Sequence, residues 1–209
     1  MKIAQLVSNL HPVSPISNNA IYSHVAWLSN GLIGLGNEVT LFASAESQTD
    51  AKLISANIKS SFLTDKIDRL KNHYANLLIS QCYQQAADFD IIHSHFTLFS
   101  LFYSALVGTP TVQSIHGSVD KEILTLIKQF KNNNFISFSL AQRKLMPELN
   151  WIANIYHGVD LKKFSFNPKP QNYFLYLGRI TEEKGVHLAI EAAKAAEVDL
   201  VLAGRSYPA

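Results

Sequence analysis

The sequence predicts an α/β protein built on a doubly wound parallel sheet, and two observations lead to this fold class. Short runs rich in β-branched and aliphatic residues alternate with longer segments whose apolar residues recur at helical spacing. Polar residues also follow directly after most of the predicted strands, as they do at the carboxyl edge of a parallel sheet. We therefore expect successive β-α-β units with side chains for binding gathered at one edge.

The first predicted strand lies within Met1 to Asn9, where Ser8 closes an apolar run that Gln5 interrupts. No small-residue cleavage pattern follows it, so we interpret the run as a strand and not as a signal peptide. A helix comes next and ends at Gly36. Its apolar residues recur in steps of four and three at Ile21, Val25, Leu28, Leu32 and Leu35.

The rest of the first domain continues the same alternation. The further strands are expected at residues 38–43, 90–93, 111–115, 135–138 and 151–156. The further helices are expected from residue 63 to before Asp88, at 98–106, from about Asp120 to Lys131, and as a short segment from Ala141.

A polar stretch at residues 161–172 with Pro168 and Pro170 is typical of a domain crossover. We therefore expect a first domain at residues 1–168 and the start of a second at 169–209. Beyond the crossover, strand 173–178, a helix around 186–193 and strand 198–203 form one β-α-β unit. Two strands and one helix bury too little surface to be stable alone. The second domain is thus expected to be incomplete, with exposed apolar surface that favours self-association or a partner chain.

Composition excludes several classes of protein. The 209 residues carry 18 basic and 16 acidic side chains, a net charge of +2, and no block of like charge, so no nucleic-acid partner is expected. The lone Cys82 suits a reducing compartment, and the cytoplasm is the expected location. The longest apolar stretch, Leu98 to Val107, is well short of the ~18 residues of a membrane span.

Histidines follow several predicted strands. His11, His95, His116 and His157 all fall at the predicted carboxyl edge, which indicates a cleft there, although loops are commonly polar for other reasons. His93 and His95 share one strand face, but with no third ligand identifiable a structural pair is favoured over a metal site.

Two other sequence patterns argue against further kinds of site. Asp88-Phe89-Asp90 has the spacing of an acidic metal motif. It precedes the strand at 90–93, however, at the amino edge of the sheet and opposite the expected cleft, so we interpret it as the turn that leads into this strand. No glycine occurs between Ser8 and Asn19, so a dinucleotide fingerprint is missing and hydride transfer is disfavoured.

The segment Gly178-Arg179-Ile180-Thr181-Glu182-Glu183-Lys184-Gly185 is a candidate anion site. A glycine ends the strand, and two cations flank the start of a helix that Thr181 and Glu182 are placed to cap. Free N–H groups at a helix N-terminus beside two cations suit a diphosphate. The alternative is an ordinary surface helix with an acidic first turn and a following lysine.

A set of motifs now runs along nearly the whole chain in a specific order. It comprises Gly31-Leu32, Gly36-Asn37-Glu38-Val39-Thr40-Leu41-Phe42-Ala43, Asp90-Ile91-Ile92-His93-Ser94-His95, His116-Gly117, His157-Gly158-Val159-Asp160 to Phe164, and Leu177-Gly178-Arg179 to Lys184-Gly185. Together these motifs resemble the family-four (group 1) retaining glycosyltransferases of the GT-B fold. The resemblance implies two Rossmann-like domains, of which the first receives the acceptor and the second binds a nucleotide-sugar.

The resemblance also implies roles for individual residues. Arg179 and Lys184 match the cations that contact the donor diphosphate, and His116 matches a histidine near the site of sugar transfer. Further candidates for the cleft are Asn19 in the first loop and His95, Ser139 and His157, the last three because they follow predicted strands. The family needs no bound metal, and its co-substrate is the nucleotide-sugar, so no cofactor is expected.

Two departures from the family pattern stand out. Asn19-Ala20 and Tyr22 replace a glycine pair and an acidic residue of the first loop, and their side chains are expected to narrow the approach of substrates. The paired glutamates that hold the donor sugar and ribose in the family belong to a part of the second domain beyond residue 209.

The leading hypothesis is therefore a retaining glycosyltransferase, present here as a fragment, that uses a glycan or lipid-linked acceptor in the cytoplasm or at the inner face of a membrane. The alternative is a catalytically incomplete acceptor-binding module that needs a partner chain or has lost activity. A sugar-nucleotide epimerase of the same architecture is disfavoured by the Gly178-Arg179 to Lys184 motif.

Overall fold

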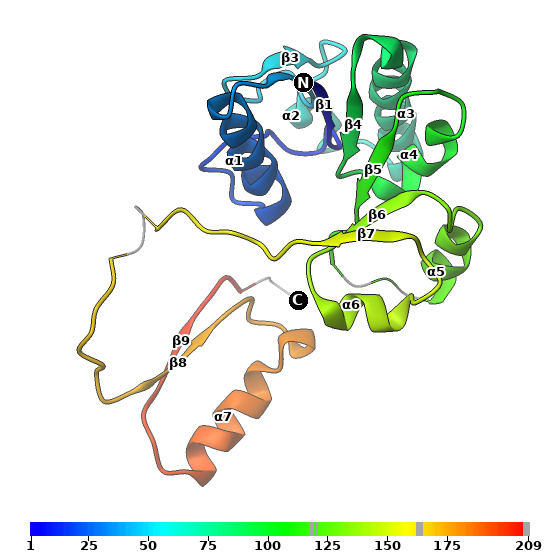
Figure 1. Ribbon diagram of the computed structural model, residues 1–209. Helices are drawn as coiled ribbons and strands as arrows, with labels where there is room; N and C mark the ends of the chain where they lie inside the picture. Colours follow the sequence, from blue (N-terminus) through cyan, green and yellow to red (C-terminus); the bar gives the residue numbers. More distant parts are fainter. Residues whose placement is uncertain (118, 120, 162–164, 207–209) are drawn as a thin grey trace. The chain divides into compact units, whose positions relative to one another are not determined.

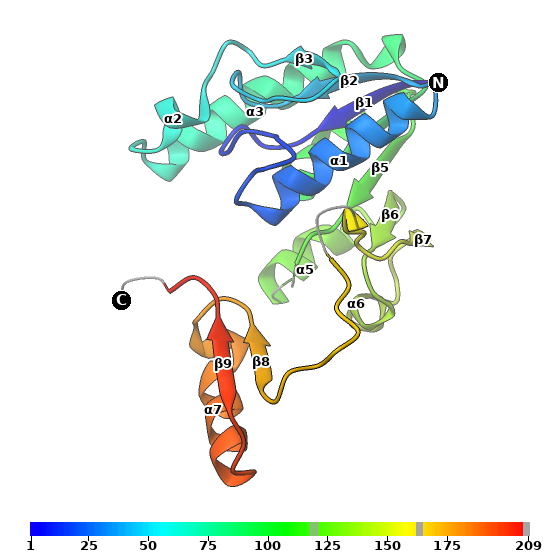
Figure 2. The same ribbon diagram turned by 90° about the vertical axis from the view of Figure 1, so that its left-hand side faces the viewer.

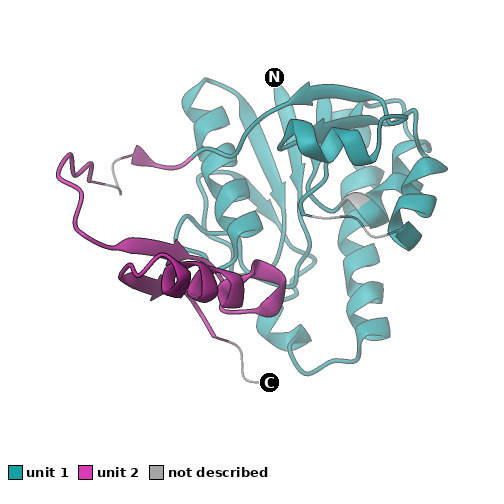
Figure 3. Ribbon diagram, turned by 90° about the horizontal axis from the view of Figure 1, so that it is seen from below, with its two compact units in different colours: residues 1–158 teal, residues 159–209 magenta. Residues whose placement is uncertain are grey.

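The structure of the protein, a computed structural model, describes residues 1–117, 119, 121–161 and 165–206. The chain divides into two compact units, Met1–Gly158 (unit 1) and Val159–Ala209 (unit 2), which Figure 3 shows in different colours. Pro168 and Pro170, which suggested the crossover, lie near the start of unit 2. The domain limits at residues 168 and 169 stay a prediction.

Unit 1 contains seven strands and the helices between them. The strands are β1 (Lys2–Leu6), β2 (Glu38–Phe42), β3 (Lys52–Ile54), β4 (Ile91–Ser94), β5 (Thr111–Ser114), β6 (Asn134–Ser137) and β7 (Trp151–Asn154). The helices are α1 (Ala20–Gly34), α2 (Ser60–Leu63), α3 (Asp68–Gln84), the 3₁₀ turn η1 (Ala86–Asp88), α4 (Thr97–Ser104), α5 (Lys121–Lys128) and α6 (Leu140–Leu145).

The seven strands form one sheet in the order β3-β2-β1-β4-β5-β6-β7, and every pairing is parallel. This confirms the predicted α/β fold class. Strand β1 lies between β2 and β4, with Gln5 opposite Leu41 on one side and His93 on the other (Figure 1). The chain leaves β1 toward β2 and leaves β4 toward β5, so the order of strands reverses here. Ligands of such sheets bind beyond the carboxyl ends at this point.

Helices cover both faces of the sheet, α1 on one and α3 on the other (Figure 1 and Figure 2). Neighbouring residues of β2 show the alternation, because Leu41 packs with Val25 and Ala26 of α1, whereas Phe42 packs with Leu78 of α3. Burial on both faces accounts for the near-continuous apolar runs of these strands. A third cluster forms under α4 and α5 from Leu101, Ile115, Ile127, Phe135, Met146 and Leu149.

The structure differs from the predicted elements in two places in unit 1. Strand β3 was not expected, because three residues are too few to show a strand period. The long helix begins only at Asp68, since residues 60–63 form a separate turn, α2, whose Leu63 is buried. The expected start of a helix at Asp120 lies outside the described residues. Among the described helices, none combines the length and apolar character that crossing a bilayer requires.

Unit 2 is a single β-α-β unit made of β8 (Phe174–Leu177), the 3₁₀ turn η3 (Glu182–Lys184), α7 (Val186–Ala195) and β9 (Leu200–Ala203). The two strands pair in parallel, with Phe174 opposite Leu200. Their ends approach so closely that a Cβ at Gly204 would lie 1.7 Å from the carbonyl oxygen of Gly178. A residue without a side chain is therefore required there.

Candidate functional site at the carboxyl edge of the sheet

The carboxyl ends of β4, β5, β6 and β7, together with helix α1, bring a cluster of aromatic side chains together in unit 1. We call His24, His93, His95, His116 and His157, with Phe138, the imidazole cluster. His24, on the second turn of α1, lies at its centre. Its ring centroid is 5.7 Å from that of His95, 5.6 Å from that of His116 and 5.0 Å from that of His157.

Phe138, directly after β6, is the hydrocarbon member of the imidazole cluster. It stacks on His157 with a centroid distance of 3.9 Å and an interplanar angle of 12°, and its centroid lies 4.6 Å from that of His116. Three of the predicted edge histidines thus meet in one place. His11, the fourth, contacts Tyr22 instead, with ring centroids 5.1 Å apart.

Hydrogen bonds join the deeper rings of the imidazole cluster to β1 and β5. His95 Nδ1 lies 2.9 Å from His116 Nε2, and His95 Nε2 lies 2.9 Å from Gln5 Oε1. The other atom of that amide, Gln5 Nε2, is 3.5 Å from His93 Nδ1, while His93 Nε2 is 2.8 Å from Ser114 Oγ. Gln5 is fully buried on the interior strand β1, so it contacts two imidazoles from a rigid position.

Burial keeps these imidazoles neutral. It lowers the pKa of His24 and of His93 to about 4 and that of His116 to about 3, and the neighbouring histidines lower them further. The pKa of His95 lies well below its usual range for the same two reasons. Partial burial of its ring also lowers the pKa of His157, although much of this residue is exposed to solvent. At pH 7 each ring therefore has one donor and one acceptor nitrogen.

Two of the predicted cleft residues cap helices. Asn19 Oδ1 accepts from the backbone N–H of Ile21, at 3.1 Å, and so caps α1. Ser139 Oγ accepts from the N–H of Gln142, at 3.1 Å, and caps α6. Both side chains satisfy amides that a helix start would leave unpaired.

Tyr22, by contrast, does not narrow the first loop as expected. It is 4% exposed, packs with Val7, Val13 and Val25, and hydrogen-bonds Ser8, because its place on α1 faces the sheet.

The backbone of the Gly178 to Gly185 loop in unit 2 is held by the side chain of Tyr176. The Tyr176 hydroxyl lies 2.9 Å from the carbonyl oxygen of Arg179 and 3.3 Å from that of Lys184, and it is placed to donate to either. Arg179 Nη2 pairs with Glu183 Oε2 at 3.3 Å. Gly185 has φ +72° and ends η3 immediately before α7. Thr181 precedes η3, but its hydroxyl makes no capping bond to it, in contrast to the expected cap.

A family model for Glycosyltransferase Family 4 matches residues 23–163, more than half of the chain. The chain belongs to glycosyltransferase family 4. Among solved structures, it is similar to a glycosyltransferase from Rickettsia africae ESF-5, with 17% identity and a TM-score of 0.57. That alignment covers 97% of this chain and 60% of the other, so the chain spans about three fifths of its length. A search of curated proteins found no match.

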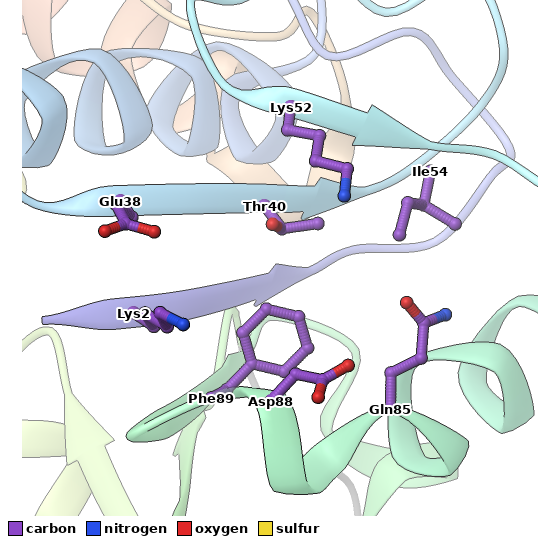
Figure 4. Close-up of a pocket in the computed structure, with 8 residues that line it drawn as sticks. All are labelled: Lys2, Glu38, Thr40, Lys52, Ile54, Gln85, Asp88 and Phe89. Atoms are coloured by element: carbon purple, nitrogen blue, oxygen red, sulfur yellow. The ribbon is translucent and has the colours of Figure 1, made fainter.

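An apolar cavity of about 200 Å³ adjoins the imidazole cluster in this family 4 chain. His95 and His116 line it together with Ile21, Phe99, Ile115 and other apolar side chains. A second cavity, of about 190 Å³, lies at the opposite edge of the sheet (Figure 4). Lys2 and Lys52 line it together with Glu38 and Asp88, so its charges balance.

Asp90, at the same amino edge, joins β1 to β4, because its Oδ2 accepts from the Lys2 N–H at 2.8 Å. This confirms the interpretation of Asp88-Phe89-Asp90 as the turn that leads into a strand, here β4. In the described part of the chain, no group of three or more His, Cys, Asp or Glu side chains is arranged to hold a metal ion.

Sequence reasoning missed two residues of this candidate site, His24 and Gln5. His24 lies on α1, whose apolar stripe indicated only that the helix packs on the core. Gln5 was interpreted only as a polar interruption of the first apolar run. A polar residue in the middle of a buried central strand needs hydrogen-bond partners, and this requirement was the available signal.

Proposed function

We propose that the protein transfers a sugar from a nucleotide-sugar donor to a glycan or lipid-linked acceptor, with retention of configuration at the sugar. Membership of glycosyltransferase family 4 is the observation that carries this proposal. The transfer takes place in the cytoplasm or at the inner face of a membrane and uses no bound metal or cofactor. In the complete two-domain protein, unit 1 receives the acceptor and the second domain binds the donor.

The proposed chemistry places charge where Arg179 and Lys184 can stabilise it. As the bond between sugar and phosphate breaks, negative charge grows on the leaving diphosphate and the sugar becomes oxocarbenium-like. Fixed cations at the diphosphate then stabilise the transition state more than the ground state. His116, in the acceptor domain, is the residue we place at the transferred sugar.

Arg179 is available for this role at little cost. Its partner Glu183 is four residues further along the chain, and both side chains are about half exposed or more, at 47% and 66%. Exposed pairs of this kind contribute about 0–1 kcal/mol. A diphosphate with two negative charges can therefore displace Glu183, and the backbone that carries Arg179 stays held through Tyr176.

Substitution in the full-length protein tests the donor site. Arg179→Ala and Lys184→Ala are each expected to lower the rate of nucleoside diphosphate release by about 30-fold to 1000-fold, which corresponds to ~2–4 kcal/mol of barrier. Lys194→Ala, in the last turn of α7, is the matched control and should leave the rate unchanged. Unchanged turnover in the first two variants, with folding intact, would contradict the diphosphate assignment.

The exposed apolar side chains of unit 2 favour a second candidate, an acceptor-binding module that a partner chain completes. Phe174 is 63% exposed and Leu177 is 79% exposed. Such a module would bind an acceptor without releasing nucleoside diphosphate, and it would dimerise or bind an apolar dye. Light scattering that shows a monomer with no dye binding would count against this candidate.

A further inference from the structure

The hydrogen bonds of the imidazole cluster have a direction that Gln5 sets. A neutral imidazole has one N–H donor and one acceptor nitrogen, whereas a glutamine amide has an acceptor oxygen and a donor NH₂. Gln5 Oε1 faces His95 Nε2 at 2.9 Å, so that nitrogen carries the proton and His95 Nδ1 is an acceptor. His116 Nε2, 2.9 Å from His95 Nδ1, must then be the donor.

The other half of the Gln5 amide is consistent with this direction. Gln5 Nε2 lies toward His93 Nδ1, which makes that nitrogen the acceptor and leaves the proton on His93 Nε2. His93 Nε2 in turn lies 2.8 Å from Ser114 Oγ, which can accept it. The amide orientation in the structure satisfies all four contacts. The reverse orientation would satisfy them with the proton of each ring on its other nitrogen, so the orientation of the Gln5 amide and the tautomers of the rings are coupled.

The interior position of β1, between β2 and β4, makes Gln5 suitable for this task. The strand is paired on both sides, with Gln5 in register with His93 on β4, and the side chain is fully buried. Its amide thus lies between the rings of His93, on the neighbouring strand β4, and His95, directly after that strand. His116, by contrast, follows β5 and is only partly buried, so it is the end of the series that a ligand can reach.

We propose that Gln5 is a positioning residue which, through His95, fixes His116 in the tautomer whose Nδ1 is unprotonated and accepts a hydrogen bond from a sugar hydroxyl. This proposal rests on the proposed function for the identity of the ligand, but the tautomer itself does not. His116 in this state selects a hydroxyl donor at Nδ1 and disfavours a carbonyl or phosphate oxygen there, because two acceptors would face each other.

Nitrogen NMR of the ¹⁵N-labelled 209-residue chain at pH 7 tests the tautomer directly. We expect His116 to show a protonated Nε2 and an unprotonated Nδ1, with a scalar coupling across the hydrogen bond to His95 Nδ1. A proton on His116 Nδ1, or the bridging proton on His95, would overturn the proposal. This measurement needs no substitution and no sugar donor, so its outcome is independent of the transfer assay.

Two matched variants test the role of Gln5. Gln5→Met removes both amide contacts, and we expect His95 and His116 to lose their single-tautomer pattern. Gln113→Met is the control, because Gln113 on β5 of the same sheet is equally buried but accepts from Ser100 Oγ, at 2.7 Å. An unchanged His116 pattern in folded Gln5→Met would overturn the role of Gln5. If that variant fails to fold, the unaltered chain provides the test. A scalar coupling across the hydrogen bond from the His95 Nε2 proton to the side-chain amide carbon of Gln5 would support the role of Gln5, and its absence would overturn it.

Discussion

Unit 1 and unit 2 bury their parallel strands to very different degrees. All four residues of β5 in unit 1 are buried, whereas three of the four residues of β8 in unit 2 are exposed. Strand β5 (Thr-Val-Gln-Ser) is the more polar of the two and β8 (Phe-Leu-Tyr-Leu) the more apolar, so composition alone would predict the opposite difference in burial. Helices cover both faces of the unit 1 sheet, while α7 is the one α-helix of unit 2 that the structure describes. Parallel sheets are generally covered by helices on both faces, and this coverage accounts for the deeper burial of the strands in unit 1.

The largest expected effect is an acid sensitivity of unit 1. The pKa values of His24 and His93 are lowered to about 4 and that of His116 to about 3, against about 6.5 in the unfolded chain. Between these values the unfolded state binds more protons, so this contribution to stability is present above pH 6.5 and is lost as the pH falls toward 4. The free energy of unfolding should drop by on the order of 3 kcal/mol or more between pH 7 and pH 4.

Tryptophan fluorescence can follow this loss, since Trp27 and Trp151, the two tryptophans of the chain, both lie in unit 1. Urea midpoints should be clearly lower at pH 4 than at pH 7. His24→Phe keeps a ring beside Phe138 and removes one titrating group, so it should flatten the dependence on pH. Equal midpoints at the two pH values would show that folding does not lower the pKa values of these imidazoles.

A pair of identical substitutions compares the two units directly. Phe135 in unit 1 is fully buried and its ring centroid lies 5.9 Å from that of Trp151, whereas Phe174 in unit 2 is 63% exposed. Phe135→Ala should lower the free energy of unfolding by about 3–5 kcal/mol, because it leaves a cavity in the core. Phe174→Ala should change it by less than about 0.5 kcal/mol. Urea unfolding followed by circular dichroism measures both, and similar losses in the two variants would show that β8 is covered in solution.

The smallest expected effects concern polar contacts at the helix starts. Asn19→Ala removes the cap of α1 and should cost about 1 kcal/mol in the unfolding of unit 1. Glu183→Gln removes the exposed partner of Arg179 in unit 2 and should cost about 0.5 kcal/mol or less. Thermal unfolding resolves the first change, and a larger shift for Glu183→Gln than for Asn19→Ala would reverse the assignment of the stronger contact.

Most of the sheet of unit 1 could be predicted from the sequence, because apolar runs and helical spacing act over short distances. Strand β3 escaped, since its three residues are held by pairing to β2 and not by a pattern of their own. The gathering of His95, His116 and His157 followed from the rule that carboxyl ends meet at one edge. The contribution of His24 required the packing angle of α1, which no local pattern encodes.

The Tyr176 hydroxyl has a consequence for how the loop from Gly178 to Gly185 tolerates change. Tyr176 contacts the backbone carbonyls of Arg179 and Lys184, and this contact does not involve their side chains. The shape of the loop is therefore separate from its charge. Either cation can therefore be exchanged for another side chain with the same backbone path expected, so the charge of this loop can be varied without changing its shape.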